Sequence, residues 1–465
     1  MYGLITYVVI VGGLFIALWK HPAVALAGVL CMFGLEQWGQ ATTPFFAQHQ
    51  TATNLIMGSL LLLAVIVQVC RRGLAILAGY PAVGWLTMGL FAYAFLSVQW
   101  APRTDFSMSL WSNRWPYVVT FIVLGPLVLA DRRDLHTAYK SLVLVGGTLT
   151  LLLLVFVEWD GRRIVLDQDL GNPLAPAIMA GLVALVIILG NPWSGSRIMF
   201  VVKWVTVLMC LALIVRSGSR GQLVGVFAVA AVCWSVSRGG SVKQLSLLFV
   251  CALCLGSATS WTIEEYWTRP GYIEHARRWT EDSAQEDVAG RIHNALSLLE
   301  VWLSSSDKII IGLGSSASYD RRILGFYPHL VPLEVLAEEG LIGISLYALI
   351  LFFTIRSAIR CYRALESDPP ERFTFGALLG GYLFMYLLSL KQGSLLLNLE
   401  PFMFGIVLGW YERHLLVMNS ALSEDEAKEG SIHEPDSPTG GNAPSESSSQ
   451  LWPAGKWGRT SNAMP

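Results

Sequence analysis

Long apolar runs, separated by short polar turns, occupy most of the chain before residue 415. A helix needs about 20 mostly apolar residues to cross the hydrocarbon core of a membrane, so the pattern predicts about twelve or thirteen spans. The two numbers differ because the first two runs are short enough to form one hairpin. The predicted spans are residues 3–19, 21–38, 53–70, 82–98, 116–130, 138–157, 174–190, 198–215, 221–236, 244–261, 329–355, 374–390 and 399–413.

Two polar regions divide this pattern into four parts. Residues 1–261 carry the first ten helices, 262–328 form a long loop with short helices, and 329–415 carry the remaining spans. Residues 416–465 are rich in Ser, Gly, Pro and Glu, and too poor in apolar residues to offset the entropy of a flexible chain, so this tail is expected to be disordered. The predicted fold class is all-α, a polytopic bundle of transmembrane helices.

Composition supports an integral membrane protein. Hydrophobic residues make up 54% of the chain and charged residues only 14%, whereas soluble domains have about 25% charged residues. A net charge of −1 argues against a nucleic-acid partner, which requires a basic surface. The seven cysteines suggest no structural disulfide, and we interpret the CxxC of Cys251 and Cys254 as helix packing.

Basic residues in short loops predict the orientation, because cytoplasmic loops carry more Lys and Arg. Alternate loops hold fourteen and seven of them, which places the long loop outside and the tail inside. The richer set is Lys20, Arg71, Arg72, Arg132, Arg133, Lys140, Arg197, Lys203, Arg238, Lys243, Arg356, Arg360, Arg363 and Arg372; the poorer set is Arg103, Arg114, Arg162, Arg163, Arg216, Arg220 and Lys391.

The first candidate for chemistry is the turn at residues 216–221, which reads Arg-Ser-Gly-Ser-Arg-Gly between two spans. Two arginines at the outer membrane edge are costly unless they are paired or hydrated. Arg216 and Arg220 are either snorkelling anchors or ligands for an anion, since a guanidinium offers a rigid fork of donors to phosphate oxygens.

The second candidate lies in the long loop, where Gly290-Arg291 precedes an amphipathic stretch and Gly312-Leu313-Gly314. Ten acidic residues outnumber seven basic ones there, so the loop is not a polyanion-binding surface. Arg291 is either a solvated or ion-paired residue or a side chain that points into a site. No strand precedes the glycines, so a nucleotide-binding loop is not expected.

The third candidate begins at Tyr327-Pro328-His329 and continues into the span that carries Glu334 and Glu338. Pro332 suits the first turn of a helix, which places His329 at the helix start. The positive end of a helix disfavours imidazolium, so the ring should be neutral and able to accept a proton. Alternatively, His329 is an ordinary interfacial residue.

The order of these three features resembles the O-antigen ligase and O-antigen polymerase family of bacterial membrane glycosyltransferases, which have a GT-C-like fold. The resemblance covers roughly residues 200–415. Leu330 departs from the family pattern, which has a polar residue there. The matching positions are Ser217, Ser219 and Arg220 in the turn, Arg291 and the Gly-x-Gly in the loop, and then His329, Gly340 and Gly343.

The resemblance implies a donor glycan on undecaprenyl diphosphate, at the periplasmic face of a bacterial inner membrane. The acceptor would be lipid A core for a ligase or a second lipid-linked glycan for a polymerase. His329 and Glu334 would serve catalysis, and Arg220, Arg291 and Arg216 would bind the diphosphate. No cofactor is expected, and no metal, because no His, Asp or Glu cluster has metal-ligand spacing.

Two other classes of protein also fit a polytopic sequence. A transporter or flippase for lipid-linked glycans has a similar number of spans, but such proteins often show internal repeats and charges at the membrane midplane. We find no repeat, and outside the Glu334–Glu338 segment the predicted spans are nearly uncharged. A membrane anchoring or assembly protein does not need arginines and a histidine on one side of the membrane.

Overall fold

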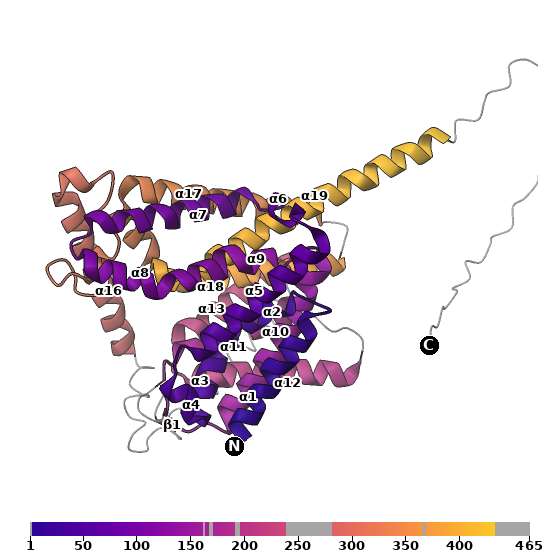
Figure 1. Cartoon of the computed structure of the whole chain (residues 1–465), viewed down its shortest axis with the longest axis horizontal. Helices are drawn as coiled ribbons and strands as arrows, with labels where there is room; N and C mark the ends of the chain where they lie inside the picture. The colour runs from indigo at the N-terminus through magenta and orange to yellow at the C-terminus, as the bar shows by residue number, and fades with distance from the viewer. Residues whose placement is uncertain are drawn as a thin grey trace, which may run out of the picture. The chain divides into compact units, whose positions relative to one another are not determined.

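The computed structural model describes residues 2–160, 163–166, 171–190, 196–238, 281–365 and 369–432. The chain divides into two compact units, residues 1–418 and 419–465. The described residues are helical throughout both units, apart from turns and one two-stranded hairpin, β1 (Trp159–Asp160) with β2 (Arg163–Ile164) (Figure 1). The predicted all-α fold class is therefore confirmed.

The helices before the long loop follow the predicted apolar runs. Their bounds are α1 (Tyr2–Leu18), α2 (Val24–Leu30), α3 (Met32–Thr42), α4 (Pro44–Gln48), α5 (Ala52–Arg72), α6 (Ala75–Ala78), α7 (Ala82–Ser97), η1 (Val98–Trp100), α8 (Thr104–Val118), η2 (Val119–Leu124), α9 (Gly125–Leu127), α10 (Arg132–Val155), α11 (Leu174–Gly190), α12 (Arg197–Arg216) and α13 (Arg220–Arg238).

The remaining described helices belong to the long loop and the C-terminal part. Their bounds are α16 (Glu281–Ser304), η3 (Ser306–Lys308), η4 (Ala317–Tyr319), α17 (Val331–Ala364), α18 (Pro369–Ser389), η5 (Leu395–Leu397) and α19 (Glu400–Ile432). The predicted span 244–261 and the CxxC at Cys251 and Cys254 lie outside the described residues.

Within the described ranges, five helical segments are long and apolar enough to cross a membrane, and three more apolar helices are shorter. The chain is thus a candidate multi-pass membrane protein, while the total of twelve or thirteen spans stays a prediction. Two predicted spans are divided in the structure. Residues 21–38 break at Cys31 between α2 and α3, and residues 116–130 contain η2, which is a π-helix.

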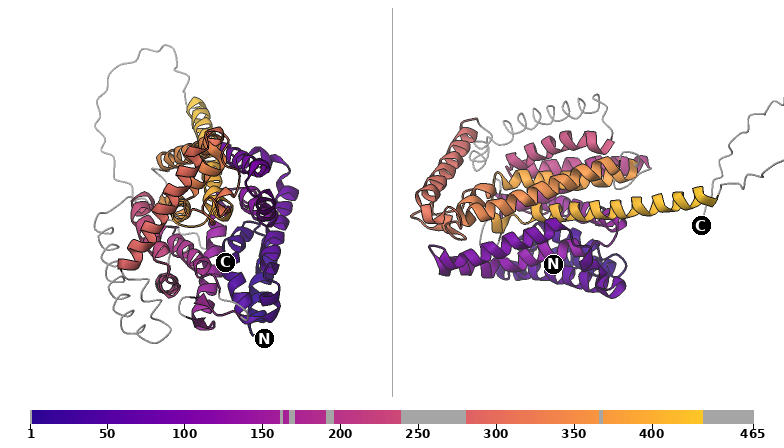
Figure 2. Two further views of the ribbon diagram at one scale, coloured as in Figure 1. Left: turned by 90° about the vertical axis from the view of Figure 1, so that its left-hand side faces the viewer. Right: turned by 90° about the horizontal axis from the view of Figure 1, so that it is seen from above.

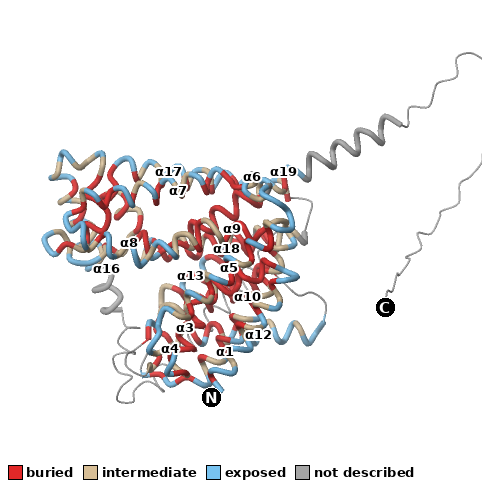
Figure 3. The backbone as a smooth tube through the Cα atoms, in the orientation of Figure 1, coloured by how far each residue is buried: buried red, intermediate tan, exposed pale blue. Residues whose placement is uncertain are grey.

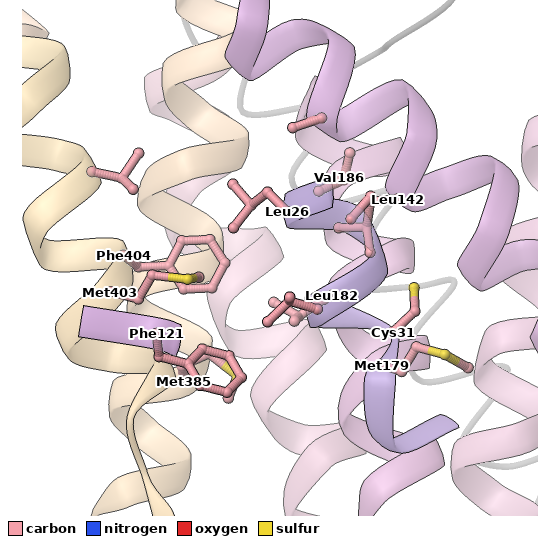
Figure 4. Packing of buried hydrophobic residues seen from close by; sticks show 14 of the residues in the cluster. Leu26, Cys31, Phe121, Leu142, Met179, Leu182, Val186, Met385, Met403 and Phe404 are labelled. Carbon is pink, nitrogen blue, oxygen red and sulfur yellow. The ribbon is translucent and has the colours of Figure 1, made fainter. Parts of the chain in front are cut away.

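Helix α11 shows how the first unit is packed. It is apolar on all sides, and almost every residue from Pro176 to Gly190 is buried (Figure 3). A helix that is hydrophobic all round belongs inside a bundle, and α11 contacts α10, α12, α13 and α18. Figure 4 shows Met179 and Leu182 of α11 in the same apolar cluster as Phe121 and Met385.

Other helices expose apolar side chains. On α12, Val201, Val205 and Leu208 lie on one face of the helix and have exposed fractions of 58%, 48% and 51%. A contiguous apolar surface of this kind is unfavourable in water and favourable against lipid tails. The exposed apolar face of α12 therefore agrees with a helix at the lipid boundary.

The described part of the long loop carries helices, as predicted. Helix α16 contacts α17 and runs across its end (Figures 1 and 2). The described part of the loop shares a small apolar core with the start of α17. This core contains Leu298, Trp302, Leu313, Ala317 and Ala337.

The second unit begins with the last part of α19, which continues to Ile432. Residues 416–432, the first part of the tail for which disorder was expected, are thus helical, and the disorder of the tail stays a prediction. The physical reason is local, because residues 421–429 are rich in Ala, Leu, Glu and Lys, which are strong helix formers. Residues 433–465 lie outside the described part.

Candidate functional site

Helix α17 is broken at Gly340, where the backbone φ is +67°. The residues just after the break bond to the loop, since Leu341 N donates to Ile309 O at 3.1 Å and Ile342 N donates to Ile310 O at 3.2 Å. A Cβ atom at residue 340 would collide with the backbone of Ile310 and Gly312. Glycine is required here both for the positive φ and for this close approach.

The Gly312-Leu313-Gly314 segment completes the contact with the break. Leu313 N donates to Ala337 O and Gly314 N donates to Glu338 O, each at 2.9 Å. Both glycines have positive φ, +84° and +97°. The Gly-x-Gly therefore satisfies carbonyl groups that the broken helix leaves open, which explains these glycines without a nucleotide.

Gly343 lies one turn after the break and is buried. A Cβ atom there would collide with the Cβ of Glu339. Glu339 is itself buried, and its carboxylate accepts a bond from Ser97 Oγ at 3.4 Å. Gly343 thus gives a buried carboxylate the room to reach α7.

The two carboxylates singled out in the sequence have separate partners. Glu334 Oε2 accepts a bond from Leu395 N at 3.1 Å. Glu338 accepts bonds from Ser316 N at 2.5 Å and Ser318 N at 3.0 Å. Both side chains are buried, and a buried carboxylate is tolerated when backbone donors compensate for its lost water. Each carboxylate therefore fixes one loop to the start of α17.

His329 lies two residues before α17 begins at Val331, and its φ is +62°. A non-glycine residue in this region is strained by about 1–3 kcal/mol, and such strain often occurs at functional sites. The imidazole is half-buried and meets the Tyr327 ring edge-on, with 4.3 Å between ring centroids. The predicted place of Pro332 in the first turn is confirmed.

The turn before α13 has the compact form that its composition indicates. Gly218 has φ +65°, and Ser217 Oγ donates to Ser219 Oγ at 2.8 Å. Both serines are buried, and Arg220 is half-buried at the first residue of α13. The serine hydroxyls therefore stabilise the turn, and Arg220 comes directly after them in the chain.

Arg216 ends α12 and turns to the hairpin, where its guanidinium lies 5.8 Å from the centroid of the Trp159 ring. Such a cation–π contact suits an arginine at a membrane edge.

Arg291 is half-buried on α16. Burial raises the pKa of the Tyr327 phenol above its usual value, the positive charge of Arg291 opposes that rise, and Glu334 adds to it. Arg291 is therefore within electrostatic reach of Tyr327, which also contacts His329. Tyr327 is thus in contact with His329 and in the electrostatic field of Arg291.

Tyr327 lines a cavity of about 320 Å³. This volume is in the usual range for a small-molecule site, about 300–1,000 Å³. One part of its lining is apolar and includes Phe33, Phe121, Met179, Leu182 and Met385; the polar part is Arg114, Tyr117, Asn172, Tyr327, Gln392, Asn398 and Glu400.

The cavity also links the Arg220 turn to the rest of the site. Gln222, two residues after Arg220, donates to Gln392 Oε1 at 3.1 Å, and Gln392 lines the cavity. The Lys391 side chain covers Gly221, since a Cβ atom there would collide with it. Tyr327 and Gln392 thus line one cavity, the first in contact with His329 and the second bonded to the residue two positions after Arg220, while His329, Arg291 and Arg220 are not among its lining residues.

Arg114 and Lys391 are site residues that sequence reasoning missed, because both were counted only as loop charges. Arg114 lines the cavity, and its buried Nε has no hydrogen-bond partner among the described residues. A buried unpaired donor is uncommon and needs an explanation. The available signal was their position at the ends of the apolar runs 116–130 and 374–390.

Within the described ranges, no group of three or more His, Cys, Asp or Glu side chains is arranged to hold a metal ion, and the five described cysteines are free. No protein-family model matches the chain, and no curated protein is similar enough in sequence to be a relative.

Proposed function

We propose that this protein is a membrane glycosyltransferase of the O-antigen ligase or polymerase type, working at the periplasmic face of a bacterial inner membrane. One observation carries the proposal. The cavity has an apolar part and a polar part with Arg114, and two of its lining residues adjoin the sequence features: Tyr327 contacts His329, and Gln392 accepts a bond from Gln222, two residues after Arg220.

The lining of the cavity suits a lipid diphosphate. An undecaprenyl chain is apolar and matches the side of Phe121 and Met385, while the diphosphate is anionic and matches Arg114. Guanidinium groups bind phosphate oxygens through paired, charge-assisted hydrogen bonds. The incompletely bonded guanidinium of Arg114 leaves donor capacity that such a ligand would use, and Arg220 and Arg291 are proposed to add to it.

In the proposed step, the oxygen of an acceptor hydroxyl attacks the anomeric carbon of the donor glycan. His329 takes the hydroxyl proton as general base. The bond from the anomeric carbon to the diphosphate oxygen breaks, and its electron pair leaves with undecaprenyl diphosphate. The attack from the opposite face inverts the anomeric configuration. The arginines stabilise the charge that develops on the leaving group.

Arginine would take the role that a divalent ion has in many phosphate sites. The described cavity offers guanidinium and amide donors, with Glu400 as its single carboxylate. We therefore expect turnover without a metal. Addition of a chelator should leave the rate unchanged; loss of turnover that a divalent ion restores would refute this part of the proposal.

The acceptor is either lipid A core, as for a ligase, or a second lipid-linked glycan, as for a polymerase. Loss of the gene distinguishes them. Surface glycan that is absent from the lipid A core indicates a ligase, and a single repeat on the core indicates a polymerase.

The direct test uses purified protein with undecaprenyl-diphosphate-linked glycan prepared from the host membrane, together with each acceptor. The readout is release of undecaprenyl diphosphate, which does not depend on the sugar. Release that requires both the acceptor and His329 supports the proposal. Movement of intact donor across a vesicle membrane without release indicates a transporter instead.

A further inference from the structure

A second groove, of about 220 Å³, lies at the other end of α17. It is formed by the start of α7, the last third of α17 and the middle of α19. Gly409 of α19 lies against Pro81 there, since a Cβ atom at residue 409 would be 3.0 Å from Pro81 Cβ. The groove belongs entirely to the first unit of the chain, and none of its residues takes part in the proposed reaction.

The groove is strongly cationic. Three arginines line it, Arg356, Arg360 and Arg413, against one carboxylate, Glu412. Glu412 is already bonded, because it accepts from Ser357 Oγ at 2.6 Å and from Arg360 Nη1 at 3.0 Å. The negative charge of Glu412 balances one of the three arginines. Two positively charged guanidinium groups in the groove are therefore not balanced by it.

The two remaining guanidinium groups belong to Arg356 and Arg413. Arg356 and Arg413 are exposed, and within the described ranges neither is paired with a carboxylate. The described contact of Arg356 is with the Phe353 ring, 5.7 Å from its centroid. Arg356 and Arg413 are on different helices and line the same groove, so one anion between them would be bound from two sides.

The position of the groove along α17 indicates a membrane edge. Arg356 and Arg360 lie 16 and 20 residues after Gly340, or about 24 and 30 Å along a helix. The hydrocarbon core is about 30 Å thick. If the break at Gly340 marks the surface near His329, the arginines reach the opposite surface.

The surface leading to the groove is apolar. On α17, Phe352, Ile355 and Ile359 have exposed fractions of 59%, 54% and 46%. An occupant with an anionic head in the groove and apolar chains along this face would satisfy both parts of the surface. Basic pockets between helices at a membrane surface are known to bind anionic lipid headgroups.

We infer that this groove binds an anionic phospholipid, with its phosphate between Arg356 and Arg413 and its acyl chains along the exposed face of α17. Phosphatidylglycerol fits, because its phosphate charge is not compensated. Phosphatidylcholine fits less well, because its own ammonium group competes with the arginines for the phosphate.

The test uses the full chain, purified in detergent with its lipids removed. Dioleoyl phosphatidylglycerol, dioleoyl phosphatidylcholine and inorganic phosphate are added separately, and bound lipid is counted by native mass spectrometry while the unfolding temperature is measured. Phosphatidylglycerol should bind and raise the unfolding temperature. Phosphatidylcholine should do so more weakly, and phosphate alone should have no effect.

The variant Arg356→Gln with Arg413→Gln should bind phosphatidylglycerol about thirtyfold more weakly, from about fivefold for each guanidinium lost. Arg363→Gln is the matched control, since Arg363 is exposed on the same helix and outside the groove. The single variant Arg356→Gln, with about a fivefold loss, replaces the double variant if that one does not fold.

Three results would overturn the inference. The parent protein binds both phospholipids equally, or phosphate alone stabilises as well as phosphatidylglycerol does, or Arg363→Gln weakens binding as much as the double variant. In the last case the arginines contribute only general surface charge, as snorkelling residues do.

Discussion

The two halves of α17, on either side of Gly340, differ in the residues that they bury and expose. Before the break, Glu334 and Glu338 are buried and bonded to backbone N–H groups of two loops. After it, the helix is regular, and Phe352 and Ile355 are exposed as lipid-facing side chains would be. One helix therefore joins a segment built for a polar site to a segment built for a membrane.

The difference lies in where each half finds its partners. The second half is specified by its own apolar residues. The first half depends on Leu395, Ser316 and Ile309, all distant in sequence. Buried carboxylates and a positive φ are costly, and they persist because surrounding contacts compensate for them. Such a segment is better suited to hold a catalytic group than to stabilise a bundle.

His329→Ala should have the largest effect on the polar half. Loss of a general base typically costs about 100- to 10,000-fold in rate, so transfer should almost cease while donor binding is retained. The measurement is release of undecaprenyl diphosphate by purified variant, with donor binding measured separately. His293→Ala is a matched control, because His293 is an exposed histidine of the loop. Near-normal turnover of His329→Ala would exclude the base role.

Arg220→Lys tests whether the turn before α13 belongs to the same site. A snorkelling anchor should accept Lys, whereas a ligand for two phosphate oxygens needs the planar fork. A lost hydrogen bond to a charged group is worth about 1.5–3 kcal/mol, so turnover should fall by about tenfold to a hundredfold. Arg220→Ala should be inactive, and Arg291→Ala should also slow turnover.

The control is Arg103→Lys, an exposed arginine on the same predicted side of the membrane. It should match the parent protein. If Arg220→Lys matches the parent as well, Arg220 is an anchor, and the diphosphate must bind elsewhere, with Arg114 and Arg216 the next candidates.

Gly340→Ala tests the boundary between the two halves by stability. A Cβ atom there meets backbone atoms of the loop at a residue with φ +67°, so the variant should lose about 1–3 kcal/mol. Gly89→Ala on α7 is the control, because nothing lies within 4 Å of its added Cβ. It should be neutral or stabilising. Equal unfolding temperatures for the two variants would contradict a required break at Gly340.

Sequence predicted the regular parts of the molecule well. Apolar runs located α5, α10 and α11 because a helix that spans a membrane must be apolar over its whole length. It failed where helices break, as at Cys31 and in the π-helix η2, since those breaks depend on neighbouring helices. It also missed the helix over residues 416–432, because the polar composition of the whole tail indicated disorder although residues 421–429 have high helix propensity.

Sequence also located the parts of the candidate site without their partners. The turn at Arg220 and the segment at His329 stand out as polar features between apolar runs. Nothing in the sequence indicates that Gln392 contacts Gln222 or that Arg114 lines the same cavity. Those contacts join residues far apart in the chain, and only the packed bundle brings them together.

Glu334 is the residue for which the comparison predicts the smallest effect. The sequence assigns it to catalysis beside His329, but its carboxylate accepts a bond from Leu395 N. Glutamine keeps an oxygen for that bond, so Glu334→Gln should retain turnover within about fivefold, the equivalent of about 1 kcal/mol. Glu334→Ala removes the acceptor and leaves the buried N–H unpaired, so it should lower stability and turnover together. The measurements are turnover as a function of pH and the unfolding temperature of both variants.

If Glu334→Gln folds normally but loses a hundredfold or more in rate, with an altered pH profile, the carboxylate takes part in proton transfer and Glu334 is a catalytic residue. Rescue by glutamine instead assigns it the role that its bond to Leu395 suggests, which is to position the loop that forms one wall of the cavity.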